Sequence, residues 1–130
     1  MAVLPQGRRG APTILLLAGE ASGDLHGARL ARALKDRIPG VELVGLGGPE
    51  MAREGVRLLA GLEDLAVMGF AEVVRHLPFF IRLGGRVKDL IRSGGIDLVI
   101  PIDYPGFNLR MTRYASRRGV PVLYLSLIHI

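Results

Sequence analysis

Residues 14–24 of this 130-residue chain read ILLLAGEASGD, and this stretch decides the fold class. Residues 14–18 form a continuous apolar run without polar alternation, which is typical of a strand buried on both faces of a parallel sheet. A glycine-rich loop follows at once, and apolar side chains then recur at helical spacing from Leu25 to Leu34, which predicts a helix. A strand, a short loop and a helix in this order begin a βαβ unit.

The rest of the chain continues this alternation. Asp24 is placed to cap the first helix, Pro39 and Gly40 end it, and residues 41–46 are a second apolar strand. The expected elements beyond them are a short helix at 49–53, a strand at 56–59, a helical segment at 69–93 that Pro78 divides, a strand at 96–102, a helix at 107–118 and a strand at 120–125. This order predicts an α/β fold, a Rossmann-like doubly wound parallel sheet with right-handed crossovers.

The composition limits the classes of function. An apolar fraction of 49% supplies the core of one compact domain, expected at residues 13–124 after a disordered tail at 1–12. Cysteine is absent, which excludes disulfides and thiolate chemistry. The net charge of +5 comes mostly from arginine and fits either an anionic partner or a solvated basic surface. An aromatic content of 5% argues against a base-stacking surface, so we expect no nucleic-acid partner.

Two further classes are disfavoured by local patterns. The N-terminal apolar run imitates a signal peptide, but it is short and leads into Glu20 and Asp24 instead of a small-residue cleavage site. No apolar run reaches the roughly 18 to 20 residues that span a bilayer. His26, His76 and His129 each lack a partner at metal-ligand spacing, so we expect no metal site and no cofactor bound through one.

The loop at residues 19–24, GEASGD, is the first candidate binding element. Its glycines have three residues between them, which matches neither the dinucleotide fingerprint nor a P-loop. Glycine lets the backbone approach a ligand closely, and the N-terminus of the next helix attracts a phosphate or sugar oxygen. Glu20, Ser22, Gly23 and Asp24 are therefore candidate substrate-binding residues. The alternative is a structural loop in which Ser22 or Asp24 is the helix N-cap.

The second candidate element follows the strand at 96–102. Asp103 lies at the carboxyl end of this strand, where α/β enzymes often present a catalytic group. A partly desolvated carboxylate has a raised pKa, which makes Asp103 a candidate general base. Asn108 is a candidate substrate-binding residue in the same loop. Both side chains have a structural alternative, because each can cap the next helix or stabilise the turn before it.

An apolar segment at residues 65–83 is the third candidate. Its apolar side chains exceed what one core-facing helix stripe requires, and arginines flank it, which suits docking on an anionic membrane surface. Ordinary core packing is the alternative. The candidate membrane or acyl-chain contacts are Val67, Phe70, Phe79, Phe80 and Leu83, and the adjacent Met68 and Gly69 are candidate substrate-binding residues.

Four motifs together resemble the lipid-A-disaccharide synthase family. They are GEASGD at 19–24, GLGGPEM at 45–51, LAVMGFAEV at 65–73 and IDYPGFN at 102–108, and the resemblance runs from about Ile14 to Tyr124. None of the motifs is specific alone, but their order and intervals are.

The resemblance implies the N-terminal half of a GT-B glycosyltransferase, in which two Rossmann-like domains face each other. It implies UDP-2,3-diacylglucosamine as donor, 2,3-diacylglucosamine 1-phosphate as acceptor, and the β-1,6-linked disaccharide phosphate and UDP as products. Asp103 matches the family's proposed base, Ser22, Gly23, Asp24 and Asn108 match cleft positions, and Met68–Gly69 matches the region near acyl chains. No cofactor or metal is implied. The implied location is the cytoplasm, on the inner face of the cytoplasmic membrane of a Gram-negative bacterium.

Two departures from the family are visible. The family continues into a further domain that supplies most UDP contacts, so we expect this chain to be inactive alone. After Ser126 the family pattern has proline and tryptophan, whereas residues 125–130 here can be encoded by CTG TCT CTT ATA CAC ATC, which resembles a transposon end used for sequencing libraries. We expect an artefactual C-terminus at 125–130. The alternative functions are half of a related GT-B enzyme or sugar-nucleotide epimerase, or a stand-alone phosphate- or nucleotide-binding α/β module.

Overall fold

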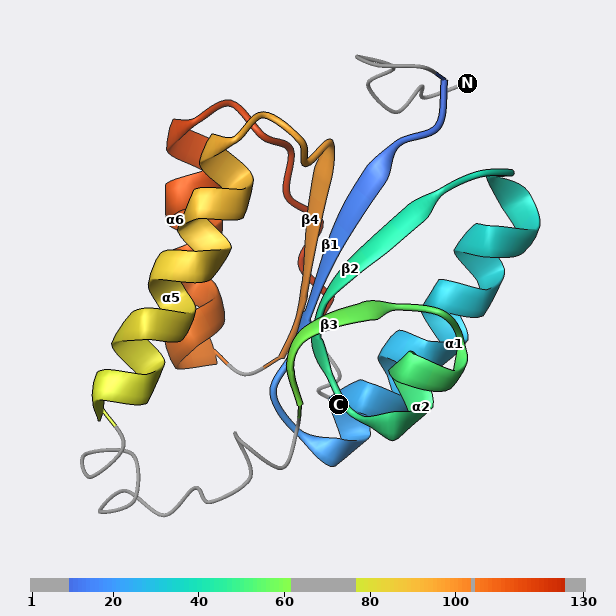
Figure 1. Ribbon diagram of the computed structural model, residues 1–130, viewed down its shortest axis with the longest axis horizontal. Helices are drawn as coiled ribbons and strands as arrows, with labels where there is room; N and C mark the ends of the chain where they lie inside the picture. Colours follow the sequence, from blue (N-terminus) through green and yellow to red (C-terminus); the bar gives the residue numbers. More distant parts are fainter. Residues whose placement is uncertain (1–9, 62–76, 104, 126–130) are drawn as a thin grey trace.

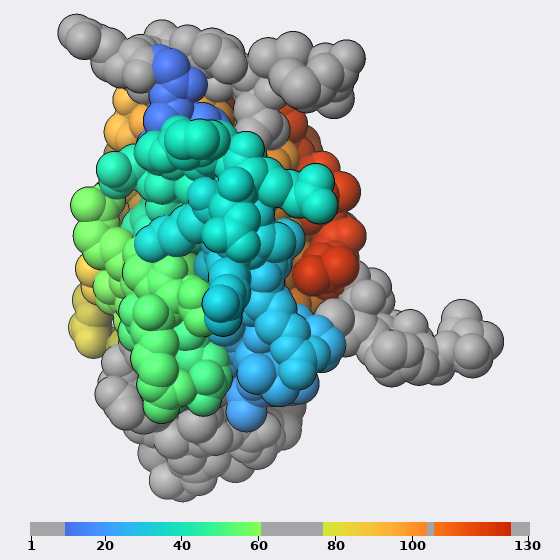
Figure 2. Space-filling view, turned by 90° about the vertical axis from the view of Figure 1, so that its right-hand side faces the viewer, coloured from blue at the N-terminus to red at the C-terminus, as the bar shows by residue number. Residues whose placement is uncertain are grey.

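Four parallel strands form the centre of the computed structural model, which describes residues 10–61, 77–103 and 105–125. The strand order is β3-β2-β1-β4, with α1 and α2 on one face of the sheet and α5 and α6 on the other (Figure 1). Figure 2 views the first face, which α1 and α2 cover. The elements are β1 (Thr13–Ala18), α1 (Ala21–Arg37), β2 (Glu42–Gly47), α2 (Pro49–Arg53), β3 (Arg57–Gly61), α5 (Leu77–Arg92), β4 (Leu98–Ile102) and α6 (Pro105–Arg117).

The central position of β1 explains why its sequence is apolar throughout. β1 pairs with β2 on one side and with β4 on the other, so both of its edges are hydrogen-bonded. Leu15 and Leu17 belong to the core cluster on the side of α5 and α6, while Ile14 and Leu16 belong to the cluster on the side of α1 and α2. Successive side chains of a strand point to opposite faces, so both alternating sets must be apolar here. The predicted α/β Rossmann-like fold is confirmed.

The two helices over the first face approach each other closely because of a glycine. Gly27 of α1 is buried, and a Cβ atom at this position would lie 2.6 Å from the Sδ atom of Met51 in α2. Such a contact is closer than van der Waals packing allows, so a Cβ atom at residue 27 would force the buried Met51 side chain to move. Met51 itself is fully buried.

The last predicted strand, at residues 120–125, is only partly realised. It forms two isolated parallel bridges to β4, Val99 with Val122 and Ile102 with Leu125. The N–H groups of Leu123 and Leu125 donate to the carbonyls of Val99 and Pro101, each at 2.9 Å. Between these bonds a regular ladder would need a donor at residue 101, and proline has none. The segment therefore runs beside β4 without continuous pairing.

The helix α2 has its predicted bounds, whereas α1, α5 and α6 begin at residues other than those predicted. Pro78 lies in the first turn of α5, where a missing N–H costs no hydrogen bond. The remainder of the segment predicted at 69–93, residues 69–76, lies outside the described residues. α1 begins at Ala21, four residues earlier than the predicted apolar periodicity, which places Asp24 inside the helix and not before it.

Candidate active site

The strand order reverses beside β1, and this reversal locates the candidate site. β2 and β3 follow one another on one side of β1, whereas β4 lies on the other side. In parallel α/β sheets ligands bind beyond the carboxyl ends of the strands at such a reversal. The loops that begin after Ala18 of β1 and after Ile102 of β4 meet at this edge, since Ala18 and Ile102 are paired.

Asp24 is buried behind this edge, and its carboxylate binds backbone N–H groups. It is 3% exposed, and its carboxylate accepts three backbone N–H groups: Gly48 at 2.8 Å and Met51 at 2.9 Å on Oδ1, and Glu50 at 3.0 Å on Oδ2. These groups are the free N–H donors at the start of α2. Asp24 therefore caps α2 from a distance.

The prediction that Asp24 caps its own helix is wrong. The N-cap residue of α1 is Glu20, which makes no side-chain capping hydrogen bond, and Ser22 lies within the first turn. The local pattern of a polar residue before an apolar run was correct about the chemistry, because a carboxylate does cap a helix here. A local pattern does not reveal which helix is capped, since Gly48 and Met51 are 24 and 27 residues away from Asp24.

The other members of the first loop lie at different depths. Glu20 and Ser22 are exposed, whereas Gly23 is buried against the end of β1, where an added Cβ atom would lie 3.2 Å from the Cβ atom of Ala18. Any contact between this loop and a ligand would therefore come from Glu20, Ser22 and the backbone.

Asp103 has an unusual backbone at the tip of β4. Its φ angle is +47°, and it is the one residue other than glycine with a positive φ in the part of the chain that the structure describes. This left-handed conformation is costly for residues with a Cβ atom, and such strain clusters at functional sites. The residue is partly exposed.

Three hydrogen bonds hold the backbone of Asp103. Its N–H group donates to the carbonyl of Leu125 at 3.0 Å. Its carbonyl accepts the Nδ2 group of Asn108 at 2.6 Å and the hydroxyl of Tyr124 at 3.0 Å. These partners come from the segment beside β4 and from α6, so two elements hold the two peptide groups that flank the Cα atom of Asp103.

Asn108 connects the ends of the paired strands β1 and β4. It is 1% exposed, and the same Nδ2 group that reaches Asp103 also donates to the carbonyl of Leu17 in β1 at 3.0 Å. The structural alternative that the sequence left open for Asn108 is thus realised, although Asn108 spans β1 and β4 instead of capping α6.

Tyr124 was not singled out from the sequence. Its contact with Asp103 spans 21 residues, so no local pattern reveals it. Burial raises the pKa of the Tyr124 hydroxyl, and the negative charge of Asp103 raises it further. Tyr124 is therefore protonated at neutral pH and able to donate.

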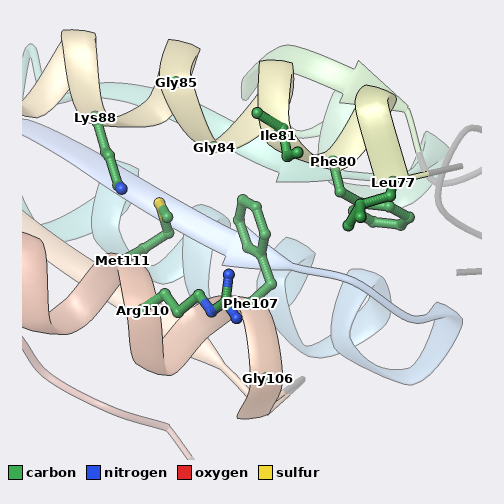
Figure 3. A pocket seen from close by; sticks show the side chains of 10 residues that line it. All are labelled: Leu77, Phe80, Ile81, Gly84, Gly85, Lys88, Gly106, Phe107, Arg110 and Met111. Atoms are coloured by element: carbon green, nitrogen blue, oxygen red, sulfur yellow. The ribbon is translucent and has the colours of Figure 1, made fainter. Parts of the chain in front are cut away.

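A groove between α5 and α6 opens near the same edge of the sheet. Its volume is about 730 Å³. Figure 3 shows Lys88 reaching from α5 toward α6, and Phe107 and Met111 reaching from α6 toward α5. The lining is apolar apart from two cations, and consists of Leu77, Phe80, Ile81, Gly84, Gly85, Lys88, Gly106, Phe107, Arg110 and Met111.

The structure divides the predicted apolar contacts between core and groove. Leu83 is 2% exposed and belongs to the core under α5, which favours core packing for this residue over lipid contact. Phe79 packs against the same cluster and meets Phe80 edge-on, with 5.4 Å between ring centroids. Phe80 lines the groove. Val67, Met68, Gly69 and Phe70 lie outside the described residues.

Comparison with known proteins places the chain in a family. A family model described as lipid-A-disaccharide synthetase matches residues 14–128. The chain belongs to the lipid-A-disaccharide synthase family. The resemblance inferred from the four motifs is confirmed.

The curated relatives of the synthase family are much longer than this chain. The lipid-A-disaccharide synthase of Syntrophus aciditrophicus is 45% identical over 111 residues, which are 85% of this chain and 29% of that protein. The synthase of Xanthomonas campestris pv. campestris is 42% identical over 121 residues, 93% of this chain and 28% of that protein. The synthase of Alcanivorax borkumensis is 42% identical over 117 residues, 90% and 30% respectively. The chain thus spans 28–30% of the length of these relatives.

One solved structure supports the fold independently. The C-terminal domain of a hydrogenase from Pyrococcus furiosus matches with a TM-score of 0.63 and 19% identity, over 95% of this chain and 99% of that domain. At this identity the match concerns the fold alone, so the synthase assignment rests on the sequence relatives.

Three of the four motifs of this synthase-family chain have distinct structural tasks. GEASGD contributes the buried Asp24 that caps α2, and GLGGPEM contributes the first three residues of that helix. IDYPGFN contributes Asp103 and the Asn108 that holds it. In the described ranges no helix is long and apolar enough to cross a membrane, and no three His, Cys, Asp or Glu side chains gather as a metal site would require.

Proposed function

We propose that the chain is the acceptor side of a lipid-A-disaccharide synthase, which transfers diacylglucosamine from UDP to diacylglucosamine 1-phosphate. The observation that carries the proposal is Asp103, a partly exposed carboxyl residue on strained backbone at the strand-order reversal of a synthase-family domain. A strained residue whose peptide is fixed by three hydrogen bonds is preorganised, as a catalytic group must be.

In the proposed reaction Asp103 acts as the general base. Its carboxylate takes the proton from the 6-hydroxyl of the acceptor as that oxygen forms a bond to the anomeric carbon of the donor. The bond from that carbon to the UDP oxygen breaks from the opposite face, so the configuration inverts and UDP leaves with the electron pair. Because this chain spans 28–30% of its relatives, we assign stabilisation of the leaving UDP to the remainder of the protein.

Glu20 and Ser22 are proposed to contact the acceptor across the reversal point, because they are exposed polar side chains at the start of α1, directly after β1. Gly23 and Asp24 are buried, and the Asp24 carboxylate binds the backbone of residues 48–51. We assign Asn108 to the positioning of Asp103, since its amide nitrogen is committed to two backbone carbonyls.

The groove between α5 and α6 is proposed to hold an acyl chain of the acceptor. Leu77, Phe80 and Ile81 provide an apolar surface in which Leu77 is 49% and Ile81 65% exposed, and a contiguous exposed apolar patch is typical of a lipid or ligand contact. Lys88 and Arg110 flank this surface and suit a phosphate or an anionic lipid headgroup. This arrangement fits a protein that docks peripherally on the inner face of the cytoplasmic membrane, and its relatives come from Gram-negative bacteria.

The function is tested with a full-length synthase that carries this segment. Incubation with UDP-2,3-diacylglucosamine and 2,3-diacylglucosamine 1-phosphate should give the disaccharide phosphate and one equivalent of UDP, measured by mass spectrometry. An epimerase would interconvert a UDP-sugar without releasing UDP. A stand-alone nucleotide-binding module would bind UDP through residues 19–24 and form no disaccharide, and either result would contradict the proposal.

The acyl-chain groove is tested at Gly85, where an added Cβ atom would meet no neighbouring atom within 4 Å. Gly85→Phe should fill the groove and raise the KM for the acceptor about tenfold or more, which corresponds to the loss of roughly two buried methylenes. Gly85→Ala is the matched control, because it improves helix propensity and leaves the groove open. An equal KM in the two variants would show that the groove is not used by the acceptor.

A further inference from the structure

The conformation of Asp103 requires support from its surroundings. A left-handed backbone at a residue with a Cβ atom persists only where neighbouring groups hold it. Aspartate tolerates this conformation better than most residues, but other backbone conformations at the end of β4 remain accessible to it. Each would point the carboxyl group in another direction, so its direction depends on what holds the peptide.

Two side chains from separate elements converge on one atom, the carbonyl oxygen of Asp103. Asn108 approaches from the first turns of α6 and Tyr124 from the segment beside β4, at 2.6 and 3.0 Å. Asn108 in addition ties this carbonyl to the end of β1 through Leu17. The carbonyl of Asp103 is thus tied to the end of β1 as well as to β4, at the point where the strand order reverses.

We propose that Asn108 and Tyr124 are positioning residues that hold Asp103 in its left-handed conformation and so direct its carboxylate toward the acceptor hydroxyl. This inference rests on the proposed function, because the direction of the carboxylate affects turnover only if Asp103 is the base. Asn108 fixes the peptide from inside the core, and Tyr124 fixes it from the surface.

The position of Tyr124 separates its effect on Asp103 from an effect on the core. Tyr124 is 37% exposed and lies at the edge of the sheet, so its ring adds little to the buried core. Its hydroxyl is protonated at neutral pH like that of any tyrosine, and burial and the charge of Asp103 raise its pKa further. Loss of the hydroxyl would let water bind the Asp103 carbonyl instead, which loosens the conformation without leaving a buried group unpaired.

Tyr124→Phe in a full-length synthase tests the proposal. We expect kcat to fall about three- to tenfold, the equivalent of one net hydrogen bond, while the KM for donor and acceptor and the melting temperature stay unchanged. The matched control is Tyr114→Phe. Tyr114 lies on α6 with its ring against Lys88 and Arg118, contacts that phenylalanine preserves, so this variant should keep the parental kcat.

A double-mutant cycle shows whether Tyr124 acts through Asp103. In an Asp103→Asn background, Tyr124→Phe should no longer change the residual rate, because the group that it positions has lost its function. The same fold loss in both backgrounds would overturn the proposal. Unchanged kcat of Tyr124→Phe beside a nearly inactive Asp103→Asn would overturn the positioning role alone, whereas near-normal turnover of Asp103→Asn would overturn the proposed base and with it the catalytic purpose of this support.

Discussion

Asp24 and Asp103 are carboxyl residues that come after the paired strands β1 and β4, and their environments are opposite. Asp24 follows β1, is 3% exposed, and gives its carboxylate oxygens to three backbone N–H groups of the 48–51 segment. Asp103 follows β4, is partly exposed, and has its backbone fixed by three hydrogen bonds. The side chain of Asp24 thus holds the backbone of another segment, whereas the backbone of Asp103 is itself held by other segments.

The difference shows how a carboxylate becomes structural or chemical. A buried carboxylate whose oxygens accept several backbone N–H groups lacks room for a substrate. A carboxyl residue whose peptide is held in a strained conformation at a strand tip can meet a ligand without first being ordered. We therefore expect substitutions at Asp24 to act on stability and substitutions at Asp103 to act on turnover.

The largest expected effect is on turnover at Asp103. Asp103→Asn keeps the size of the side chain and its tolerance of positive φ but removes the base, so kcat of a full-length synthase should fall about 10²- to 10⁴-fold. Steady-state kinetics and a thermal melt measure the two quantities. A variant that unfolds at lower temperature and retains its kcat would reverse the comparison with Asp24.

Asp24→Ala should destabilise the domain by roughly 3 kcal/mol or more, since three charge-assisted hydrogen bonds are lost and the start of α2 is left without acceptors. Hydrogen–deuterium exchange should speed up at residues 48–51. Asp36→Ala is the matched control, because Asp36 is an exposed residue near the C-terminal end of the same helix and should change stability by less than about 0.5 kcal/mol. If exchange at 48–51 were unchanged in Asp24→Ala, the distant cap would be disproved.

Asn108→Ala should cost about 2 kcal/mol of unfolding free energy and also lower kcat, because Asn108 is both buried and bonded to Asp103. This variant combines the loss of stability expected at Asp24 with the loss of turnover expected at Asp103. Thr112→Ala on the same helix is the control, since the Thr112 hydroxyl binds only the carbonyl of Leu109 among the bonds described for it, and its loss should leave kcat alone.

The smallest expected effect concerns the backbone of Asp103. Asp103→Gly should be more stable than Asp103→Ala by up to about 1 kcal/mol, because glycine adopts positive φ without a steric penalty. Urea unfolding of the two variants measures the difference. Equal stability would mean that the left-handed conformation at residue 103 is not strained, which would weaken the contrast with Asp24.

The order of strands and helices could be predicted because it depends on local apolar patterns. The continuous run in β1 and the proline at the start of α2 gave correct elements, since burial on both faces and helix initiation are encoded within a few residues. The segment at 120–125 was less successful, because its pairing is limited by Pro101 on a neighbouring strand. A pattern within that segment contains no information about its partner.

The candidate site was predictable only in part, for the same reason. Asp103 was found because the carboxyl end of a strand can be identified from the strand itself. The groove was missed, since Lys88 and Phe107 lie on two helices whose separate periodicities do not show that they face each other.

By itself, the sequence determined that this chain is an α/β domain of the synthase family with Asp24 and Asp103 at the ends of its strands. The tertiary structure decided which of the two is buried and which is presented, because that depends on the distant groups that surround each carboxyl residue. The N–H groups at 48–51 meet Asp24, and Tyr124 and Asn108 meet the peptide of Asp103, only after the strands have paired.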